Sequence, residues 1–253
     1  MKEQLYTIPL VDVLKAGDEC PFCCVERKLE QEALDFVLGA SYMESDIREE
    51  TDKAGFCRRH YKMMFDYGNS LGNAWILSTR FKYMNSRMKE LMDGYGPEKA
   101  SLFGRMKKGK GEESRPPLIK WLKEEEEHCY FCSRVNTTYE RYLDTFFYLF
   151  KKDREFVSLV EQSKGFCLHH FGELMEASQS RLNAKEQEEF CSLVFRLMKE
   201  NMDRVQEDIN WFIEKYDYRN QDADWKNSKD AIQRTMQKMA GGYPADPVYK
   251  NKK

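Results

Sequence analysis

The chain has 253 residues, of which 41% are hydrophobic and 33% are charged, and its formal net charge is -2. This composition supplies enough apolar side chains for a buried core and excludes a wholly disordered protein. The near balance of charge gives no general attraction to nucleic acid, so nucleic acid is not an expected partner. No stretch of about 18 apolar residues occurs and no secretory signal is visible, so we expect no membrane span and a cytoplasmic location.

The first half is predicted to be helical. Residues 5–13 have a weak extended pattern, which Pro9 weakens further. After the CPFC motif of residues 20–23, apolar residues recur at three- and four-residue steps, which predicts a helix. These residues are Val25, Leu29, Ala33, Val37 and Leu38. A return segment over residues 45–54 and a long helical segment over 58–92 follow.

The second half repeats this pattern after the CYFC motif of residues 129–132. The apolar positions of its first helix are Val135, Tyr139, Tyr142, Leu143, Phe146 and Phe150. A return segment over 152–164 precedes a helical segment over 169–216, with a break near 178–183. In the tail, Asn227 or Ser228 is predicted to cap a short helix that ends before Gly241.

Several motifs occur twice. CPFC recurs as CYFC after 109 residues, GFCRRH as GFCLHH after 110, and MKELMD at 88–93 as MKENMD after 110. Such a constant displacement indicates an internal duplication. We therefore predict an all-α protein with two duplicated helical units. The predicted boundaries are a first repeat over 1–103, a linker over 104–117, a second repeat over 118–216, and a C-terminal helix and tail over 217–253.

Each half contains Cys-x-x-Cys followed by Gly-Phe-Cys-x-x-His, with 33 intervening residues in the first half and 34 in the second. Four thiolate and imidazole ligands are typical of a tetrahedral zinc ion. The glycine before the second pair, Gly55 or Gly165, is expected to turn the chain with a positive φ. We predict two zinc ions per chain, one in each half. The ligands are Cys20, Cys23, Cys57 and His60 in the first half, and Cys129, Cys132, Cys167 and His170 in the second.

Since each set of four is complete, the zinc is predicted to be structural rather than catalytic. An iron–sulfur cluster remains an alternative, because histidine replaces cysteine in some clusters. CPFC alone is similar to a glutaredoxin-type redox motif, but the βαβ context is missing. His169 is the substitute ligand if the register differs. Cys24 and Cys191 have no counterpart in the other half.

Four separated motifs carry a family resemblance. YTIPLVDVL before ECPFC, the paired GFCxxH, and KYDYRN with Trp225 and SKDA in the tail resemble a bacterial domain-of-unknown-function family found chiefly in Firmicutes. The resemblance spans residue 6 to about residue 242 and implies paired metal motifs without a known reaction. Some members are labelled automatically as ABC transporter substrate-binding proteins. Such receptors need an export signal and a two-lobed α/β fold, which this sequence does not indicate.

The function that these observations favour is a non-enzymatic, zinc-binding helical protein that binds an unknown protein or small molecule. The alternatives are a redox sensor or enzyme that uses a thiolate, and a weak nucleic-acid binder. The last alternative rests on Arg58, Arg59 and the basic loop 107–110, which is part of a basic run over 105–110.

Overall fold

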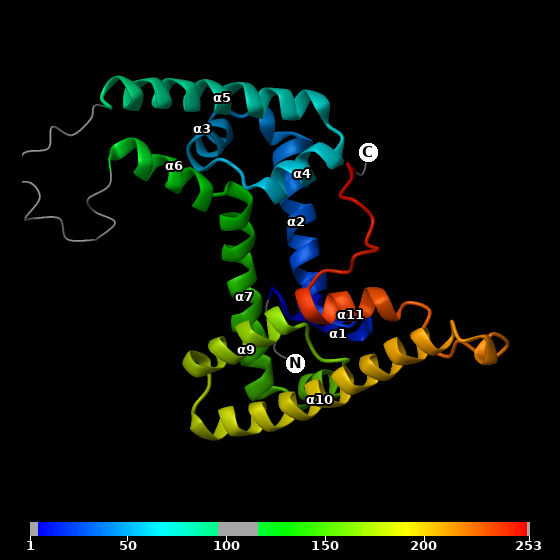
Figure 1. The fold of residues 1–253 in the computed structure, drawn as a ribbon. Helices are drawn as coiled ribbons and strands as arrows, with labels where there is room; N and C mark the ends of the chain where they lie inside the picture. Colours follow the sequence, from blue (N-terminus) through cyan, green and yellow to red (C-terminus); the bar gives the residue numbers. More distant parts are fainter. Residues whose placement is uncertain (1–4, 96–115, 252–253) are drawn as a thin grey trace, which may run out of the picture. The chain divides into compact units, whose positions relative to one another are not determined.

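The structure is a computed structural model that describes residues 5–95 and 116–251. Within these residues the secondary structure is helical and contains no strand, which confirms the all-α prediction (Figure 1). The α-helices are α1 (Thr7–Lys15), α2 (Pro21–Gly39), α3 (Ser45–Ala54), α4 (Arg58–Tyr67), α5 (Ser70–Asp93), α6 (Pro117–Glu127), α7 (Tyr130–Lys152), α8 (Arg154–Gln162), α9 (Leu168–Arg181), α10 (Ala184–Glu214) and α11 (Ala231–Ala240). Short 3-10 helices are η1 (Ser41–Met43) and η4 (Tyr218–Asn220). None of the described helices is both long enough and apolar enough to cross a membrane.

The extended pattern over residues 5–13 is a wrong prediction, since this segment forms α1. Pro9 is the third residue of the helix. The amide groups of the first turn have no partner inside a helix, so a proline there removes no helical hydrogen bond.

The helices that follow the two Cys-x-x-Cys motifs are confirmed as α2 and α7. All the apolar positions predicted from their periodicity are buried. Periodicity located these helices well because both bury a continuous apolar stripe.

The helical segment over 58–92 is divided, contrary to the prediction, into α4 and α5. Gly68 ends α4 in the left-handed conformation with φ 84°, and the Asn69 side chain accepts a hydrogen bond from Gly72 N at 2.9 Å to begin α5. The predicted break in the second half is confirmed between α9 and α10. There Asn183 and Glu186 form a capping box.

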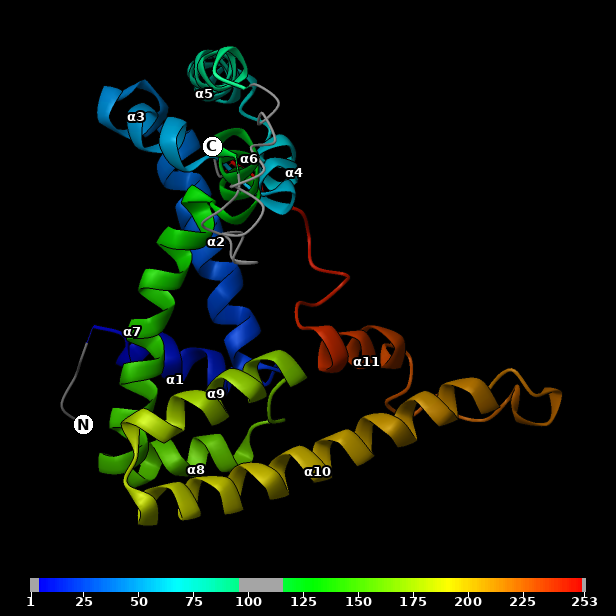
Figure 2. The same ribbon diagram turned by 60° about the vertical axis from the view of Figure 1, so that its left-hand side comes forward.

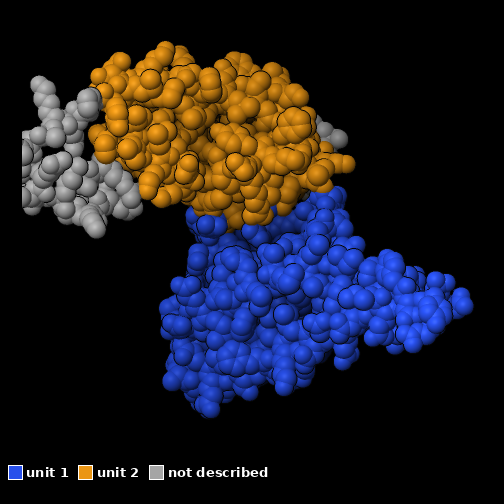
Figure 3. All heavy atoms as spheres, in the orientation of Figure 1, with its two compact units in different colours: residues 1–30, 136–247 blue, residues 31–135, 248–253 orange. Residues whose placement is uncertain are grey.

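The chain forms two compact units, coloured separately in Figure 3. Unit 1 comprises residues 1–30 and 136–247, and unit 2 comprises 31–135 and 248–253. The boundaries of the units therefore differ from the halves of the sequence, because they fall inside α2 and α7. Of the predicted linker, residues 104–115 lie outside the described residues, while Pro116 caps α6 and Pro117 begins it.

The core of unit 1 is aromatic. Figure 2 shows α8 and α9 alongside α10, and contacts also join α1 to α8 and α11 to α9 and α10. Six phenylalanines are at most 1% exposed: Phe22, Phe146, Phe147, Phe156, Phe166 and Phe190. The Phe146 ring lies 5.5 Å from the Phe22 ring and 5.4 Å from the Phe156 ring, centroid to centroid. Edge-to-face contacts of this kind add to the free energy of burial.

Unit 2 is built around α3, α4, α5 and α6, with α3 packed on α5. Its core contains Leu34, Leu38, Phe56, Met64, Ile76 and Phe131, each buried. Arg80 of α5 is also buried; it forms an ion pair with Glu125 of α6 and donates to the Asp52 carbonyl. The ion pair joins α5 to α6, and the hydrogen bond to the Asp52 carbonyl joins α5 to α3.

Candidate metal centres

All eight predicted ligands lie in two groups of four, but the grouping differs from the prediction. The Cys20 cluster, in unit 1, contains Cys20, Cys23, Cys167 and His170. The Cys57 cluster, in unit 2, contains Cys57, His60, Cys129 and Cys132. The expectation of one site within each half of the sequence is therefore wrong. Each Cys-x-x-Cys pair joins the Cys-x-x-His pair of the other half.

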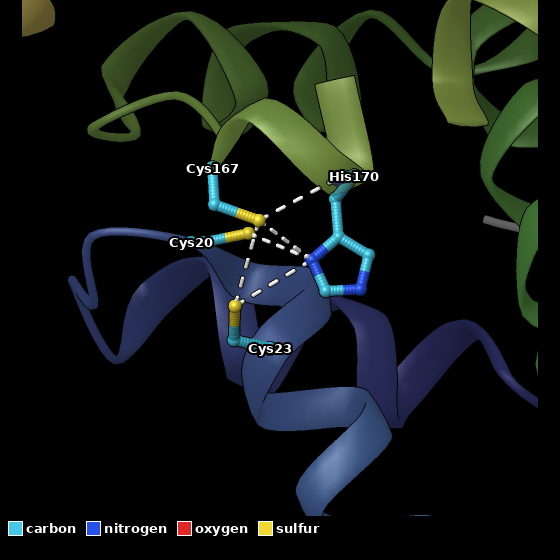
Figure 4. Close-up of side chains that lie close together, drawn as sticks. All are labelled: Cys20, Cys23, Cys167 and His170. Atoms are coloured by element: carbon cyan, nitrogen blue, oxygen red, sulfur yellow. Dashed lines mark hydrogen bonds between the residues drawn. The ribbon is translucent and has the colours of Figure 1, made fainter. Parts of the chain in front are cut away.

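In the Cys20 cluster, three sulfur atoms surround one ring nitrogen of His170 (Figure 4). The distances from His170 Nδ1 to the Sγ atoms of Cys20, Cys23 and Cys167 are 3.4, 3.5 and 3.1 Å. The Sγ atoms of Cys23 and Cys167 are 3.8 Å apart. All four side chains are buried.

The Cys57 cluster repeats this geometry. The distances from His60 Nδ1 to the Sγ atoms of Cys57, Cys129 and Cys132 are 3.2, 3.3 and 3.4 Å. The Sγ atoms of Cys57 and Cys132 are 3.9 Å apart. Here Cys57 and Cys132 are partly exposed, whereas Cys129 and His60 are buried.

These spacings are those of the edges of a tetrahedron around one ion. Zinc–sulfur bonds of about 2.3 Å and zinc–nitrogen bonds of about 2.0–2.1 Å give edges of about 3.8 Å between sulfurs and about 3.5 Å between sulfur and nitrogen. In each cluster the three sulfur–nitrogen separations and the one sulfur–sulfur separation given above agree with these values to within a few tenths of an ångström, and all ligand atoms lie within 4.8 Å of one another. Both clusters can therefore hold a metal ion with Cys₃His ligation.

The local structure that presents each Cys-x-x-His pair is the same in both units. Cys57 and Cys167 cap α4 and α9 with nearly equal backbone angles, φ -73° and ψ 163° against φ -75° and ψ 164°. The histidine is then the third residue of the helix, and its Nδ1 lies close to the sulfur of the capping cysteine. Gly55 and Gly165 take φ 63° and 77°, which confirms the predicted positive angles.

Each Cys-x-x-Cys motif presents a phenylalanine to the histidine of its own cluster. The ring centroids of Phe22 and His170 are 5.9 Å apart, and those of Phe131 and His60 are 5.3 Å apart, both with an interplanar angle of 33°. The other ring nitrogen of His170, Nε2, lies 3.9 Å from Glu26 and 4.0 Å from Glu173. Carboxylates near the second nitrogen help to orient a ligating imidazole.

Burial and hydrogen bonds shift the pKa values of the metal-free clusters in different directions. Burial raises the pKa of the Cys20 thiol, and raises that of Cys132 to about 12. It lowers the pKa of His60 to about 4, and the charge of Arg59 acts in the same direction. Hydrogen bonds from Cys20 and Cys23 hold the pKa of Cys167 below its ordinary value. A metal ion must therefore displace protons from thiols in both clusters.

Sequence reasoning missed the contribution of the tail to the Cys20 cluster. Gly242 N donates to Cys23 Sγ at 3.2 Å, and a Cβ on Gly241 would lie 3.5 Å from Cys167 Sγ. Both glycines have positive φ, 77° at Gly241 and 64° at Gly242. The paired glycines were a signal of close backbone approach, but the prediction used them only to end a helix.

The remaining candidates lie outside both clusters. His169 is exposed and 3.3 Å from Glu173, so it does not replace His170. Cys24 and Cys191 belong to neither cluster. Arg58 and Arg59 are exposed beside the Cys57 cluster, whereas the basic residues 105–110 lie outside the described residues.

The fold and the two clusters define an all-helical protein with paired Cys₃His sites suited to metal ions. The chain belongs to DUF6062, a family of unknown function, which it matches over residues 1–246. This match supports the resemblance to a domain-of-unknown-function family. Comparison with curated proteins and with solved structures found no match.

Proposed function

We propose that the protein binds two zinc ions per chain, one in each cluster, and that it is a cytoplasmic, non-enzymatic binding protein. The observation that carries the zinc assignment is the tetrahedral spacing of the ligand atoms, with sulfurs 3.8 and 3.9 Å apart. Three thiolates and one imidazole are also a ligand set that zinc prefers.

The zinc is structural in this proposal. Each cluster supplies four protein ligands, so a tetrahedral ion has no open position for water or substrate. Each ion also joins distant parts of the chain: Cys23 and Cys167 are 144 residues apart, and Cys57 and Cys132 are 75 apart. Such sites contribute their binding free energy to folding.

The same geometry disfavours an iron–sulfur cluster. In such a cluster the thiolates bind different iron atoms, which spreads the ligands over a larger volume. Here all ligand atoms of a cluster lie within 4.8 Å of one another, which suits a single ion. A thiol redox role is disfavoured at the Cys20 cluster, because such chemistry needs a reactive, accessible thiolate and the sulfurs of this cluster are buried. At the Cys57 cluster it is disfavoured because burial raises the pKa of the partly exposed Cys132 to about 12.

Elemental analysis of the full chain, purified without oxygen, tests the metal. We expect about two zinc ions per chain, and the same content in Cys24→Ser and Cys191→Ser controls. Iron together with visible absorption would overturn the zinc assignment.

Circular dichroism during removal of the metal by a strong chelator tests its role. We expect helical signal to fall as the metal leaves. A metal-free protein with unchanged helicity and melting temperature would overturn the structural role.

A further inference from the structure

Unit 1 contains an open cleft with a volume of about 530 Å³, between the α8–α9 connection, α10 and the start of α11. It contains none of the eight metal ligands. Its basic lining residues are Lys164, Arg204, Lys226, Lys229 and Arg234. Only two carboxylates, Glu19 and Asp230, line it as well. The cleft is therefore rich in positive charge on a chain whose net charge is -2.

The buried Glu19 carboxylate cannot neutralise the cations around it. It lies 2.6 Å from Arg204, 3.3 Å from Lys238 and 3.8 Å from Lys164. Asp208 lies 3.9 Å from Arg204 but also pairs with Arg234, so the carboxylates are outnumbered by the cations near them. The excess positive charge is unfavourable unless an anion balances it.

The Arg234 guanidinium is already neutralised by carboxylates of the protein. It forms ion pairs with Asp208 at 2.7 Å and Asp230 at 2.9 Å. Its role is to hold the segment before α11 in place.

Lys226 and Lys229, the exposed lysines of the cleft, carry positive charge that no carboxylate in the described part of the chain neutralises. In residues 5–95 and 116–251, no ion pair joins Lys226 or Lys229 to a carboxylate. The Lys226 ammonium lies 4.1 Å from the ring centroid of Trp211, and its backbone has φ 51°. A non-glycine residue in this region is strained and is held there by its surroundings, here partly by Lys226 N donating to Asp224 Oδ1. The backbone of Lys226 is therefore held at the rim of the cleft, and its ammonium rests on Trp211, where no carboxylate of the described residues neutralises it.

The other lining groups are polar: Gln162, Ser163, Asn201 and Asn227. No large apolar side chain lines the cleft, so it suits a strongly polar ligand. Lysine ammonium groups bind phosphate as point charges, and amide groups supply further donors. The volume is that of a small-molecule site.

We propose that this cleft binds a small phosphate-bearing molecule through Lys164, Lys226 and Lys229, with Arg204 behind them. The cleft lies next to the Cys20 cluster in sequence, because Glu19 precedes Cys20 and Lys164 precedes the Gly-Phe-Cys-x-x-His motif. The ligand is recognised by its phosphate charge, so this proposal does not depend on which metal the clusters hold.

Calorimetric titration of the full, metal-loaded chain with pyrophosphate tests the proposal. We expect saturable binding that weakens as salt rises from 50 to 200 mM. Lys164→Ala and Lys229→Ala should each weaken it by about 2- to 5-fold, and Lys164→Glu with Lys229→Glu should abolish it. Lys199→Ala, an exposed lysine of α10 outside the cleft, is the matched control and should leave binding unchanged.

Three results would overturn the proposal: no binding of pyrophosphate, equal weakening by Lys199→Ala, or tighter binding of citrate than of pyrophosphate. Binding of single-stranded RNA that displaces pyrophosphate and is tighter than pyrophosphate would also overturn it, since the cleft would then belong to a nucleic-acid surface. Zinc is counted in the same samples. Two zinc ions without pyrophosphate binding would refute the cleft alone, and binding without zinc would refute the metal assignment alone.

Discussion

Replacement of Cys167 by serine tests which cysteines share a metal ion. In the structure Cys167 belongs with Cys20 and Cys23, whereas grouping by sequence half would place it with Cys129 and Cys132. Without this thiolate the cluster has only three ligands, and departure of the metal opens a loop of 144 residues, which by loop-closure entropy alone is worth about 5 kcal/mol. Since domains of this size are stable by only about 5–15 kcal/mol, we expect unit 1 to lose much or all of its stability.

The assay is zinc analysis followed by brief alkylation and mass spectrometry. Cys167→Ser should bind about one zinc ion, and alkylation should increase at Cys20 and Cys23 while Cys129 and Cys132 stay protected. Cys191→Ser, a cysteine of the same unit outside the cluster, should keep two zinc ions and the protection of both clusters. Alkylation of Cys129 and Cys132 with continued protection of Cys20 and Cys23 would refute the grouping across halves.

A chelator should remove metal from the Cys57 cluster first, because two of its thiols are partly exposed whereas the Cys20 cluster is buried. Alkylation at intermediate metal content shows which cluster loses its metal first. Earlier loss from the Cys20 cluster would contradict this reasoning. Gly242→Pro removes the amide that donates to Cys23 and is incompatible with φ 64°, so metal should leave the Cys20 cluster at least several-fold faster, while the Cys57 cluster serves as the internal control. Gly55→Ala should destabilise the protein more than Gly17→Ala. Both glycines have a positive φ, but of the two only Gly55 has a side chain close to the added Cβ, 2.5 Å away at Arg80. Equal shifts of the thermal midpoint in the two variants would argue against this reasoning. Zinc affinity should weaken as pH falls, because burial raises the pKa of the metal-free thiols, to about 12 at Cys132. The expected loss is up to about tenfold per pH unit for each proton that the metal displaces. Competition with a chelator at several pH values measures the affinity, and a pH-independent affinity would be the contrary result.

The elements and the ligands could be predicted from the sequence because both are encoded locally. Periodicity located α2 and α7, and the spacing of cysteine and histidine picked out the eight side chains that the structure brings together. The positive φ at Gly55 and Gly165 followed from the same motifs. Two local errors have local causes: Pro9 is harmless in the first turn of α1, and Gly68 with Asn69 divides α4 from α5.

The grouping of the ligands could not be predicted because no local signal distinguishes the two possible partners. Each Cys-x-x-Cys begins a helix and each Cys-x-x-His caps one, with nearly equal backbone angles. Any Cys-x-x-Cys therefore fits either Cys-x-x-His, and a duplicated chain offers both combinations. The prediction followed the duplication and placed one site in each half, which is also the combination that loop-closure entropy favours.

That preference is small. Cys23 is 34 residues from Cys57 in the sequence and 144 from Cys167, and Cys132 is 35 from Cys167 and 75 from Cys57. Loop-closure entropy therefore favours the nearer partner by about 1 kcal/mol in each case. A difference of one buried phenylalanine between the two groupings, about 1.5–3 kcal/mol, is enough to outweigh this term. In the structure the rings of Phe22 and Phe166 lie 6.1 Å apart, and those of Phe131 and Phe56 lie 5.2 Å apart. Each ring pair joins a Cys-x-x-Cys motif to the Gly-Phe-Cys-x-x-His motif of the other half, so the aromatic core and the metal ligands select the same partners.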